Sequence, residues 1–363
     1  MLIAAPRLQA FVRDVFLREG CSEAEATRIG RYLVAANLAG HDSHGVIRVP
    51  RYLGWLRDGT VKADRAPELV SDSGSFALVD AHYGFGQTAG PFAVELGIAK
   101  AAQHGVAIVA LRHAGHLGRI GEWAEQAAEA GLVSVHFVNV SGSLLVAPFG
   151  AVERRFSTAP FAAAVPVAGG PPVVLDFATS LVAEGKVLVA SQGGKPLPPG
   201  SLIAPDGQLS QDPATLYGPL HGSGVRDRGL GAIRAFGEHK GSGLALMCEL
   251  LAGALTGSGC AGPPPKRFCN GMLSIYMTPA LFGSADGFAA ETRAYLDFVA
   301  SARPADPDGA TLLPGEPERL SRARCFAEGV PLTDEVWAAL REAGLPHGIE
   351  AERYRAGSAP GGS

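Results

Sequence analysis

The spacing of apolar residues changes near residue 75, and this change restricts the folds that the chain can adopt. Before it, Leu8, Phe11 and Phe16 recur at helical spacing, and Ser22 with Glu25 forms the pattern of a capping box. After it, short apolar runs alternate with amphipathic segments, which predicts strands alternating with helices. The helical pattern returns after about residue 285. We therefore expect an α/β fold whose two ends are helical.

Composition and charge limit the compartment and the partners of the chain. It has 363 residues, 47% of them hydrophobic, which is enough for a sizeable core. A net charge of -4 without a basic tract argues against nucleic acid or an anionic membrane as partner. The apolar stretch 161–183 is interrupted by prolines and glycines, so it does not predict a membrane span. Five widely spaced cysteines and no signal peptide predict a cytoplasmic protein with free thiols.

A glycine-rich turn at residues 84–90 lies between an expected strand and an expected helix. Its pattern resembles the dinucleotide fingerprint G-x-G-x-x-G, but the last gap is one residue longer. The next strand ends in Arg112 and His113, without an acid that could hold a ribose. We therefore prefer a tight turn before a helix over a Rossmann dinucleotide site.

The segment 41–48 concentrates groups that can carry chemistry. Arg48 can hold a carboxylate through two parallel hydrogen bonds, and His44 can exchange a proton near neutral pH. A cap or a surface feature is the alternative interpretation of the Ser43-His44 pair. His41, Asp42 and His44 could also ligate a metal, although no downstream motif completes such a site.

Three later positions are also candidates. His116 follows a buried strand and precedes a helix, where it can act in acid–base chemistry or cap the helix. Asp176 ends an apolar strand and can bind a ribose hydroxyl, orient a histidine or cap the next helix. Lys240 lies at the start of a strong helix, where a cation and free amides favour an anion.

In their order along the chain, these motifs resemble the type-2 malate/L-lactate dehydrogenase family. That family also includes ureidoglycolate, sulfolactate and 2,3-diketogulonate oxidoreductases and Δ1-piperideine-2-carboxylate reductases. The resemblance covers about residues 5 to 350. The matching motifs are Ser43-His44-Gly45 with Arg48, His116-Leu117-Gly118, residues 146–150, Asp176 with residues 178–180, residues 239–247, and Pro314-Gly315-Glu316.

The resemblance implies an α/β fold with a non-Rossmann nicotinamide-binding domain on a mixed sheet, and a helical domain formed by both chain termini. We expect residues 1–72 in the helical domain, 73–262 in the cofactor-binding domain, and 263–350 as the remaining strand and C-terminal helices. Residues 351–363 are expected to be a disordered tail. The family also implies a homodimer that uses NAD or NADP.

The resemblance assigns roles to single residues as well. His116 and His44 are the proton-transfer candidates, Ser43 supports His44, and Arg48 binds the substrate carboxylate with Thr158 as a second substrate contact. No metal is expected. The residues expected along the cofactor are His116, Leu117, Gly118, Arg119, Ile120, Val174, Leu175, Asp176, His239, Lys240, Gly241, Pro314, Gly315 and Glu316.

The predicted function is hydride transfer between NAD(P)H and a small 2-oxo or 2-hydroxy acid of the malate or lactate type. In the reducing direction the histidine is expected to act as an imidazolium, and in the oxidising direction as a neutral base. A reductase of a cyclic imino acid such as Δ1-piperideine-2-carboxylate is the alternative. A further alternative is a non-catalytic or metal-dependent protein that uses His41, Asp42 and His44.

The sequence departs from the family pattern in three places. Ser157-Thr158-Ala159-Pro160 stands where Gly-Thr-Asn-Pro is common, so the amide of the usual asparagine is missing. Ser242 replaces an aromatic residue. Arg119 replaces a small or apolar one and could extend anion recognition toward a cofactor phosphate.

Overall fold

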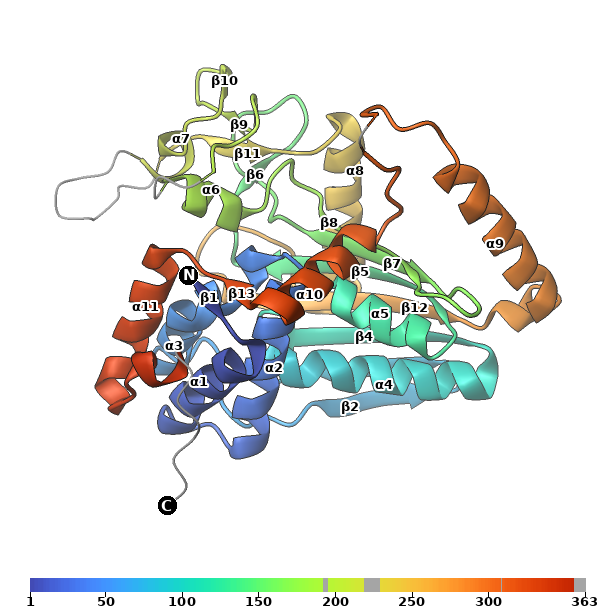
Figure 1. Ribbon diagram of the computed structural model, residues 1–363, viewed down its shortest axis with the longest axis horizontal. Helices are drawn as coiled ribbons and strands as arrows, with labels where there is room; N and C mark the ends of the chain where they lie inside the picture. The colour runs from blue at the N-terminus through green and yellow to red at the C-terminus, as the bar shows by residue number, and fades with distance from the viewer. Residues whose placement is uncertain (192–194, 219–228, 308, 356–363) are drawn as a thin grey trace.

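A seven-stranded mixed sheet forms the middle of the molecule (Figure 1). The computed structural model describes residues 1–191, 195–218, 229–307 and 309–355. The strand order is β2-β3-β4-β12-β5-β7-β8; β3 runs parallel to β4, and the other neighbouring strands are antiparallel. The strands are β2 (Glu68–Ser73), β3 (Phe76–Asp80), β4 (Val106–Ala114), β5 (Val133–Ser141), β7 (Pro160–Val165), β8 (Val173–Ala178) and β12 (Cys269–Met277). This confirms the mixed α/β fold.

Helices cover both faces of this sheet because side chains alternate along each strand. On β5, Val138 faces a core shared with α4 (Gly86–His104) and α5 (Gly121–Glu129). The neighbouring Phe137 and Asn139 face α8 (His239–Cys248) and the π-helical segment Glu249–Ala254 that continues it. The predicted helix near residues 241–255 therefore exists, with a widened second half.

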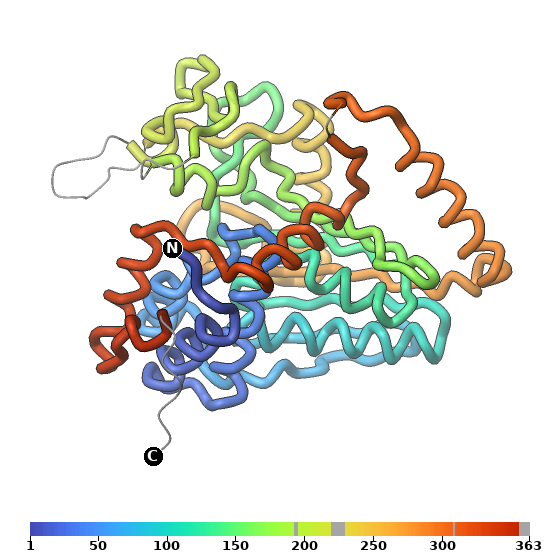
Figure 2. The backbone as a smooth tube through the Cα atoms, in the orientation of Figure 1, coloured from blue at the N-terminus to red at the C-terminus, as the bar shows by residue number. Residues whose placement is uncertain are grey.

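The two ends of the chain share one apolar core outside the sheet, and Figure 2 shows the blue start of the chain beside the red C-terminal segments. Strand β1 (Leu2–Ile3) pairs with β13 (Val330–Pro331), and the N-terminal ammonium donates to the carbonyl oxygen of Leu332 at 2.8 Å. The helices and 3-10 turns of this part are α1 (Ala5–Arg18), α2 (Glu23–Leu38), η1 (Asp42–His44), η2 (Val46–Arg48), α3 (Val49–Arg57), α10 (Glu316–Glu328), α11 (Asp334–Gly344), η5 (Leu345–His347) and η6 (Ala351–Tyr354).

Two expectations about the chain ends are corrected. The sequence predicts helical structure to about residue 70, but residues 68–73 form strand β2. Every side chain of this edge strand is exposed, so the strand lacks the alternation of apolar residues that would predict it. The disordered tail does not begin at residue 351. Tyr354 packs on Phe11 with ring centroids 5.4 Å apart and donates its hydroxyl to Asp14 at 2.5 Å. Residues 356–363 lie outside the described part.

A small four-stranded sheet packs beside the large one, in the order β10-β9-β11-β6 with its own apolar core. A further helix, α9 (Ala285–Ala300), stands at one side of the molecule in Figure 1, and none of its residues is buried. The elements of the small sheet are β6 (Val146–Ala147), α6 (Glu184–Ser191), β9 (Leu202–Ile203), β10 (Leu209–Ser210), α7 (Ala214–Tyr217) and β11 (Ala232–Arg234), and η4 (Pro279–Leu281) precedes α9.

Within the described residues, no helix combines the length and the apolar character that a membrane crossing requires. All five cysteines are free thiols, and only Cys260 is not fully buried.

Candidate active site

The turn that carries His44 and Arg48 is held by a buried asparagine of α2. Asn37 donates from Nδ2 to Asp42 Oδ1 at 2.6 Å and accepts from the backbone N–H of Val46 at 2.9 Å. A Cβ atom at Gly45 would lie 2.2 Å from Asn37 Oδ1, so only glycine allows this close approach. The two short turns η1 and η2 therefore present His44 and Arg48 in a fixed relation.

His116 reaches the same place from the end of β4. Gly115 donates to the carbonyl oxygen of Gly84 at 2.7 Å, and a Cβ atom at Gly86 would lie 2.2 Å from the carbonyl oxygen of His116. The rings of His44 and His116 are parallel within 7°, with centroids 5.6 Å apart. The glycines of the 84–90 turn thus serve close packing against the His116 segment, in agreement with the interpretation as a tight turn.

A tyrosine and a glutamine fix the tautomer of His116. The hydroxyl of Tyr52 lies 2.7 Å from His116 Nδ1, and Gln87 Nε2 donates to the Tyr52 oxygen at 3.0 Å. Gln87 Nε2 also lies 3.4 Å from the carbonyl oxygen of His116, which can only accept, so this atom is the amide nitrogen. With this donor on the Tyr52 oxygen, the Tyr52 hydroxyl is placed to donate to Nδ1, an arrangement that puts the proton of neutral His116 on Nε2.

Burial keeps both histidines neutral. Burial, with the positive charge of Arg48 second, lowers the pKa of His44 to about 3, and the same two causes hold the pKa of His116 well below 6.5. Burial raises the pKa of Tyr52 to about 12, so its hydroxyl stays a donor. Ser43 Oγ lies 3.1 Å from His44 Nδ1. In the ligand-free protein, the imidazolium expected for reduction is therefore not the resting form.

Arg48 faces the site, and among the described residues only its Nε has a close hydrogen-bond partner. Its Nε donates to the carbonyl oxygen of Ser43 at 2.6 Å, while Nη1 lies 3.6 Å from Glu184 Oε2. Arg51 donates to both oxygens of Glu184, at 3.1 and 3.3 Å. A carboxylate can therefore approach Arg48 beside this ion pair.

Arg119 lies in a closed ion-pair network. Its side chain is 2% exposed, donates to Glu125 at 2.9 Å, and has Asp176 Oδ2 at 3.5 Å from Nε. Glu125 is also bound by Arg322 of α10 at 2.5 Å. The suggested contact of the Arg119 guanidinium with a cofactor phosphate is corrected, because three carboxylates, the third being Glu122, already surround it.

Residues of β8 and of the 314–316 turn meet as expected. Val174 donates its backbone N–H to the carbonyl oxygen of Pro314 at 3.1 Å, and a Cβ atom at Gly315 would lie 3.3 Å from that nitrogen. Leu175 is 40% exposed although it lies mid-strand, and Glu316 caps the turn by accepting from the backbone N–H of Leu313. These segments lie next to residues 116–121, because Asp176 contacts Arg119.

The 239–241 segment is joined to the end of β8 through Phe236. Phe236 accepts from the backbone N–H of Gly241 at 3.0 Å and donates its own to the carbonyl oxygen of Thr179. Ser242 accepts from the backbone N–H of Phe149 at 2.9 Å, a contact that an aromatic residue there could not make. His239 packs against the ring of Phe149.

The residues that depart from the family pattern near β7 have structural roles. Ser157 donates to the buried carboxylate of Glu249 at 2.9 Å and accepts from the backbone N–H of Ala159. Ala159 has a φ of 29°, a backbone conformation that asparagine adopts more easily than alanine. The carbonyl oxygen of Thr158 accepts from Thr179. Within the described residues, the Thr158 side chain makes no hydrogen bond with His44, His116 or Arg48.

The three side chains of the possible metal cluster point to different partners. His41 Nε2 lies 3.0 Å from Glu318, Asp42 binds Asn37, and His44 stacks on His116. Across the described residues, no group of three or more acidic, histidine or cysteine side chains is arranged to hold a metal ion.

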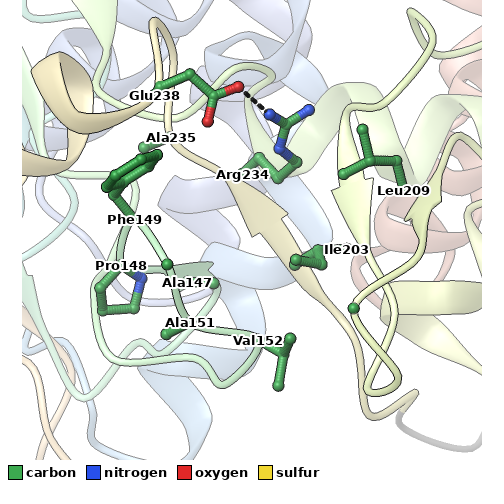
Figure 3. Close-up of a pocket in the computed structure, with 12 residues that line it drawn as sticks. Ala147, Pro148, Phe149, Ala151, Val152, Ile203, Leu209, Arg234, Ala235 and Glu238 are labelled. Atoms are coloured by element: carbon green, nitrogen blue, oxygen red, sulfur yellow. Dashed lines mark hydrogen bonds and ion pairs between the residues drawn. The ribbon is translucent and has the colours of Figure 1, made fainter.

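A pocket of about 360 Å³ lies between the 147–152 loop and the small sheet (Figure 3). The Arg234–Glu238 ion pair lines it on one side and Phe149 on another. Residues 147–150 of the matching motif 146–150 line it, as does Glu238 next to residue 239, but neither His44, His116 nor Arg48 does. His44, His116 and Arg48 therefore form a separate candidate site between the helical part and the large sheet.

Sequence reasoning missed several residues of this site. Tyr52 follows Arg48 by four positions, a spacing that places both on one helix face and could have indicated it. Asn37 is a buried polar residue whose partners Asp42 and Val46 follow 5 and 9 positions later. Gln87 is also buried, and its partner Tyr52 lies 35 residues away. Glu184 lies 133 residues from Arg51 and gave no signal at all.

The fold and the site define a class of enzyme. A guanidinium that can bind an acid, beside two neutral imidazoles with one fixed tautomer, suits proton exchange at an oxygen or nitrogen next to a carboxylate. Among the residues described here, no group of acidic, histidine or cysteine side chains is arranged to hold a metal ion. Such a site fits an oxidoreductase of small carboxylic acids.

The comparisons identify the family. The profile of the malate/L-lactate dehydrogenase family matches residues 3–341, so the chain belongs to this family. Hydroxycarboxylate dehydrogenase B of Escherichia coli strain K12 is 40% identical over 357 residues, which are 97% of this chain and 96% of that protein. A Δ1-pyrroline-2-carboxylate/Δ1-piperideine-2-carboxylate reductase of Pseudomonas putida is 36% identical, with 92% and 94% covered.

Solved structures agree with this assignment. The structure of a putative malate/lactate dehydrogenase from E. coli superposes with a TM-score of 0.89 at 40% identity, covering 98% of this chain and 97% of that one. Sulfolactate dehydrogenase from Methanocaldococcus jannaschii gives a TM-score of 0.83 at 30% identity, with 98% and 99% covered. The chain is an NAD(P)-dependent oxidoreductase that acts on a small hydroxy, oxo or imino acid.

Proposed function

We propose that the chain reduces a small 2-oxo acid, or oxidises the matching 2-hydroxy acid, with Arg48 as carboxylate anchor and His116 as proton-transfer residue. The observation that carries this proposal is the relay from Gln87 through Tyr52 to His116 Nδ1. It leaves an N–H on Nε2 for an oxygen held next to Arg48. His44, stacked on His116 and hydrogen-bonded to Ser43, is the second proton-transfer residue.

The charge of the bound acid supports this proton transfer. In the free protein, the Arg48 guanidinium lowers the pKa of both histidines. A carboxylate on Arg48 compensates that positive charge, and a nearby anion raises the pKa of an imidazole. Substrate binding therefore brings the histidines closer to the protonated form that reduction needs, while their neutral form suits oxidation.

The residues around His116 fit a nicotinamide cofactor. Gln87 Oε1 is buried without a hydrogen-bond partner among the described residues, so an amide N–H₂ group beside His116 would satisfy it. The 116–120 segment, the exposed Leu175, and the turn at Pro314 and Gly315 would line the rest of the cofactor, with Lys240 toward its phosphates. When bound, the cofactor supplies or accepts the hydride.

Reduction of a cyclic imino acid is the second candidate, favoured by the identity to a Δ1-pyrroline-2-carboxylate reductase. Both reactions use a carboxylate anchor and a proton donor at the adjacent C=O or C=N bond. Steady-state assays of pyruvate, oxaloacetate, phenylpyruvate and Δ1-piperideine-2-carboxylate with NADH and NADPH separate them. We expect the highest kcat/KM with a 2-oxo acid; a higher value with the imino acid would reverse the assignment. A lack of turnover with all four would refute both.

We also propose that the chain is a homodimer whose helical domain is formed by both termini and whose cofactor domain is built on the mixed sheet rather than on a Rossmann turn. Exposed apolar side chains support the dimer: Leu246, Met247, Leu250 and Leu255 on the α8 and π-helical segment, and Tyr295 and Phe298 on α9. A 16-residue helix without any buried residue gains little stability alone, so a second copy covering it is expected.

A further inference from the structure

Two arginines of the active site share a single carboxylate. Arg48 and Arg51 both approach Glu184, the first residue of α6, and the hydroxyl of Tyr217 donates to Glu184 Oε1 at 3.1 Å. The next residue, Gly185, brings α6 directly against the catalytic turn, since a Cβ atom there would lie 2.5 Å from the Cβ atom of Ser43. Glu184 is thus built into the substrate end of the site.

Glu184 compensates charge without blocking the anchor. Its two oxygens take both hydrogen bonds from Arg51, while its approach to Arg48 is 3.6 Å, beyond a normal hydrogen bond. The terminal nitrogens of Arg48 therefore stay available to a substrate carboxylate. Glu184 and Arg51 are the charged groups that act most strongly on Arg48.

We propose that Glu184 determines the charge of the acid that the site accepts, and selects acids with one carboxylate over dicarboxylates. The inference rests on the proposed function and specifies its substrate class. Two guanidiniums and one carboxylate leave one net positive charge, which one substrate carboxylate neutralises. A second carboxylate on the substrate would lie near Glu184, where the described residues offer no further cation to compensate it. Like charges a few ångströms apart in such a site weaken binding on the order of tenfold or more.

The test compares two unreactive acids, oxamate with one negative charge and tartronate with two, by calorimetry on the protein saturated with NADH. For the wild type, oxamate should bind more tightly. Glu184→Gln keeps the side-chain size and removes the charge. The ratio of the affinity for tartronate to the affinity for oxamate should therefore rise by about tenfold or more. Glu153→Gln, which removes a carboxylate from the exposed pair with Arg155, should leave the ratio unchanged.

A second variant shifts the ratio the other way. Arg51→Gln removes one positive charge, so both acids should bind more weakly and tartronate should lose more. A purely structural effect would change both affinities in the same proportion. The proposal is overturned if the affinity ratio of either folded variant stays within twofold of wild type or moves in the opposite direction. If the ratios shift as expected but no 2-oxo acid is turned over, this inference stands and the proposed reaction fails.

Discussion

Tyr52 holds His116 in one tautomer through a hydroxyl that is itself held by Gln87. Among the described residues, Tyr52 is the only hydrogen-bond partner of His116 Nδ1. Tyr52 is a positioning residue, since it reaches the substrate only through the imidazole. Orienting partners of this kind change activity by about 10- to 100-fold when removed from metal-bound histidines.

For Tyr52→Phe we expect kcat to fall by about tenfold or more, because both tautomers of His116 then become populated. The KM for the acid should change little, since Arg48 is untouched, and the pH profile of kcat should shift. Tyr276→Phe is the matched control, because it also removes a hydroxyl from a fully buried tyrosine. Tyr276 packs on Gly97 and is far from His44 and His116 in sequence. Equal losses of kcat in both variants would contradict the role of Tyr52.

The sequence singles out His44, Arg48 and His116, which the structure brings together, but it does not predict the residues around them. His44, Arg48 and His116 lie in short motifs whose spacing is visible in one chain. Glu184 and Gln87 join them through contacts between distant segments, and no local pattern encodes such contacts. Arg119 shows the opposite error: an arginine next to a cofactor motif suggested phosphate binding, yet Glu122, Glu125 and Asp176 enclose it.

The helices and strands show the same division between local and distant information. The capping pair at α2 exists in part: Ser22 accepts from the backbone N–H of Glu25, but the Glu25 carboxylate turns to Thr88 and Asp64. The sequence predicts where α2 begins, because its apolar stripe and its N-cap residue Ser22 are local features. Strand β2 was missed because an exposed edge strand needs no apolar alternation, and pairing with β3 defines it.

Helix α9 carries the clearest prediction about a single element. Its exposed Tyr295 and Phe298, at 63% and 70%, lie three positions apart on one face. In the proposed dimer, Tyr295→Glu with Phe298→Glu should place charges in the interface and give a species of one chain, 37.4 kDa, by light scattering.

Wild type should have twice that mass. Leu345→Glu, at another exposed leucine outside α8 and α9, should leave the dimer intact. A wild type of one-chain mass would refute the dimer, and a double variant that remains dimeric would move the interface away from α9.

The molecule as a whole should lose stability in mild acid. Burial lowers the pKa of His44 and of His136 to about 3, and that of His116 well below 6.5. Below pH 6.5 the unfolded chain binds protons that the folded state does not, so these groups stabilise the fold fully above pH 6.5. Their contribution falls as the pH drops toward 3, by up to about 1.4 kcal/mol per pH unit for each group.

His136 isolates this effect, because burial causes its pKa shift and its ring nitrogens pair with the neutral hydroxyls of Ser274 and Ser134 inside the large sheet. Urea unfolding between pH 7 and pH 5 should show a smaller loss of stability in His136→Gln than in wild type. His104→Gln, at an exposed histidine, should keep the wild-type slope. An unchanged slope in His136→Gln would mean that this histidine takes up its proton in the folded state.

The pairing of β1 with β13 ties the first three residues to residues 330–332. During synthesis, the apolar core of α1 and α2 therefore closes only after residues 330–332 have been translated. A chain truncated before residue 330 would leave the apolar surface of α1 and α2 exposed to solvent and prone to aggregation. The same clasp argues for attaching purification tags away from Met1, whose ammonium group is part of it.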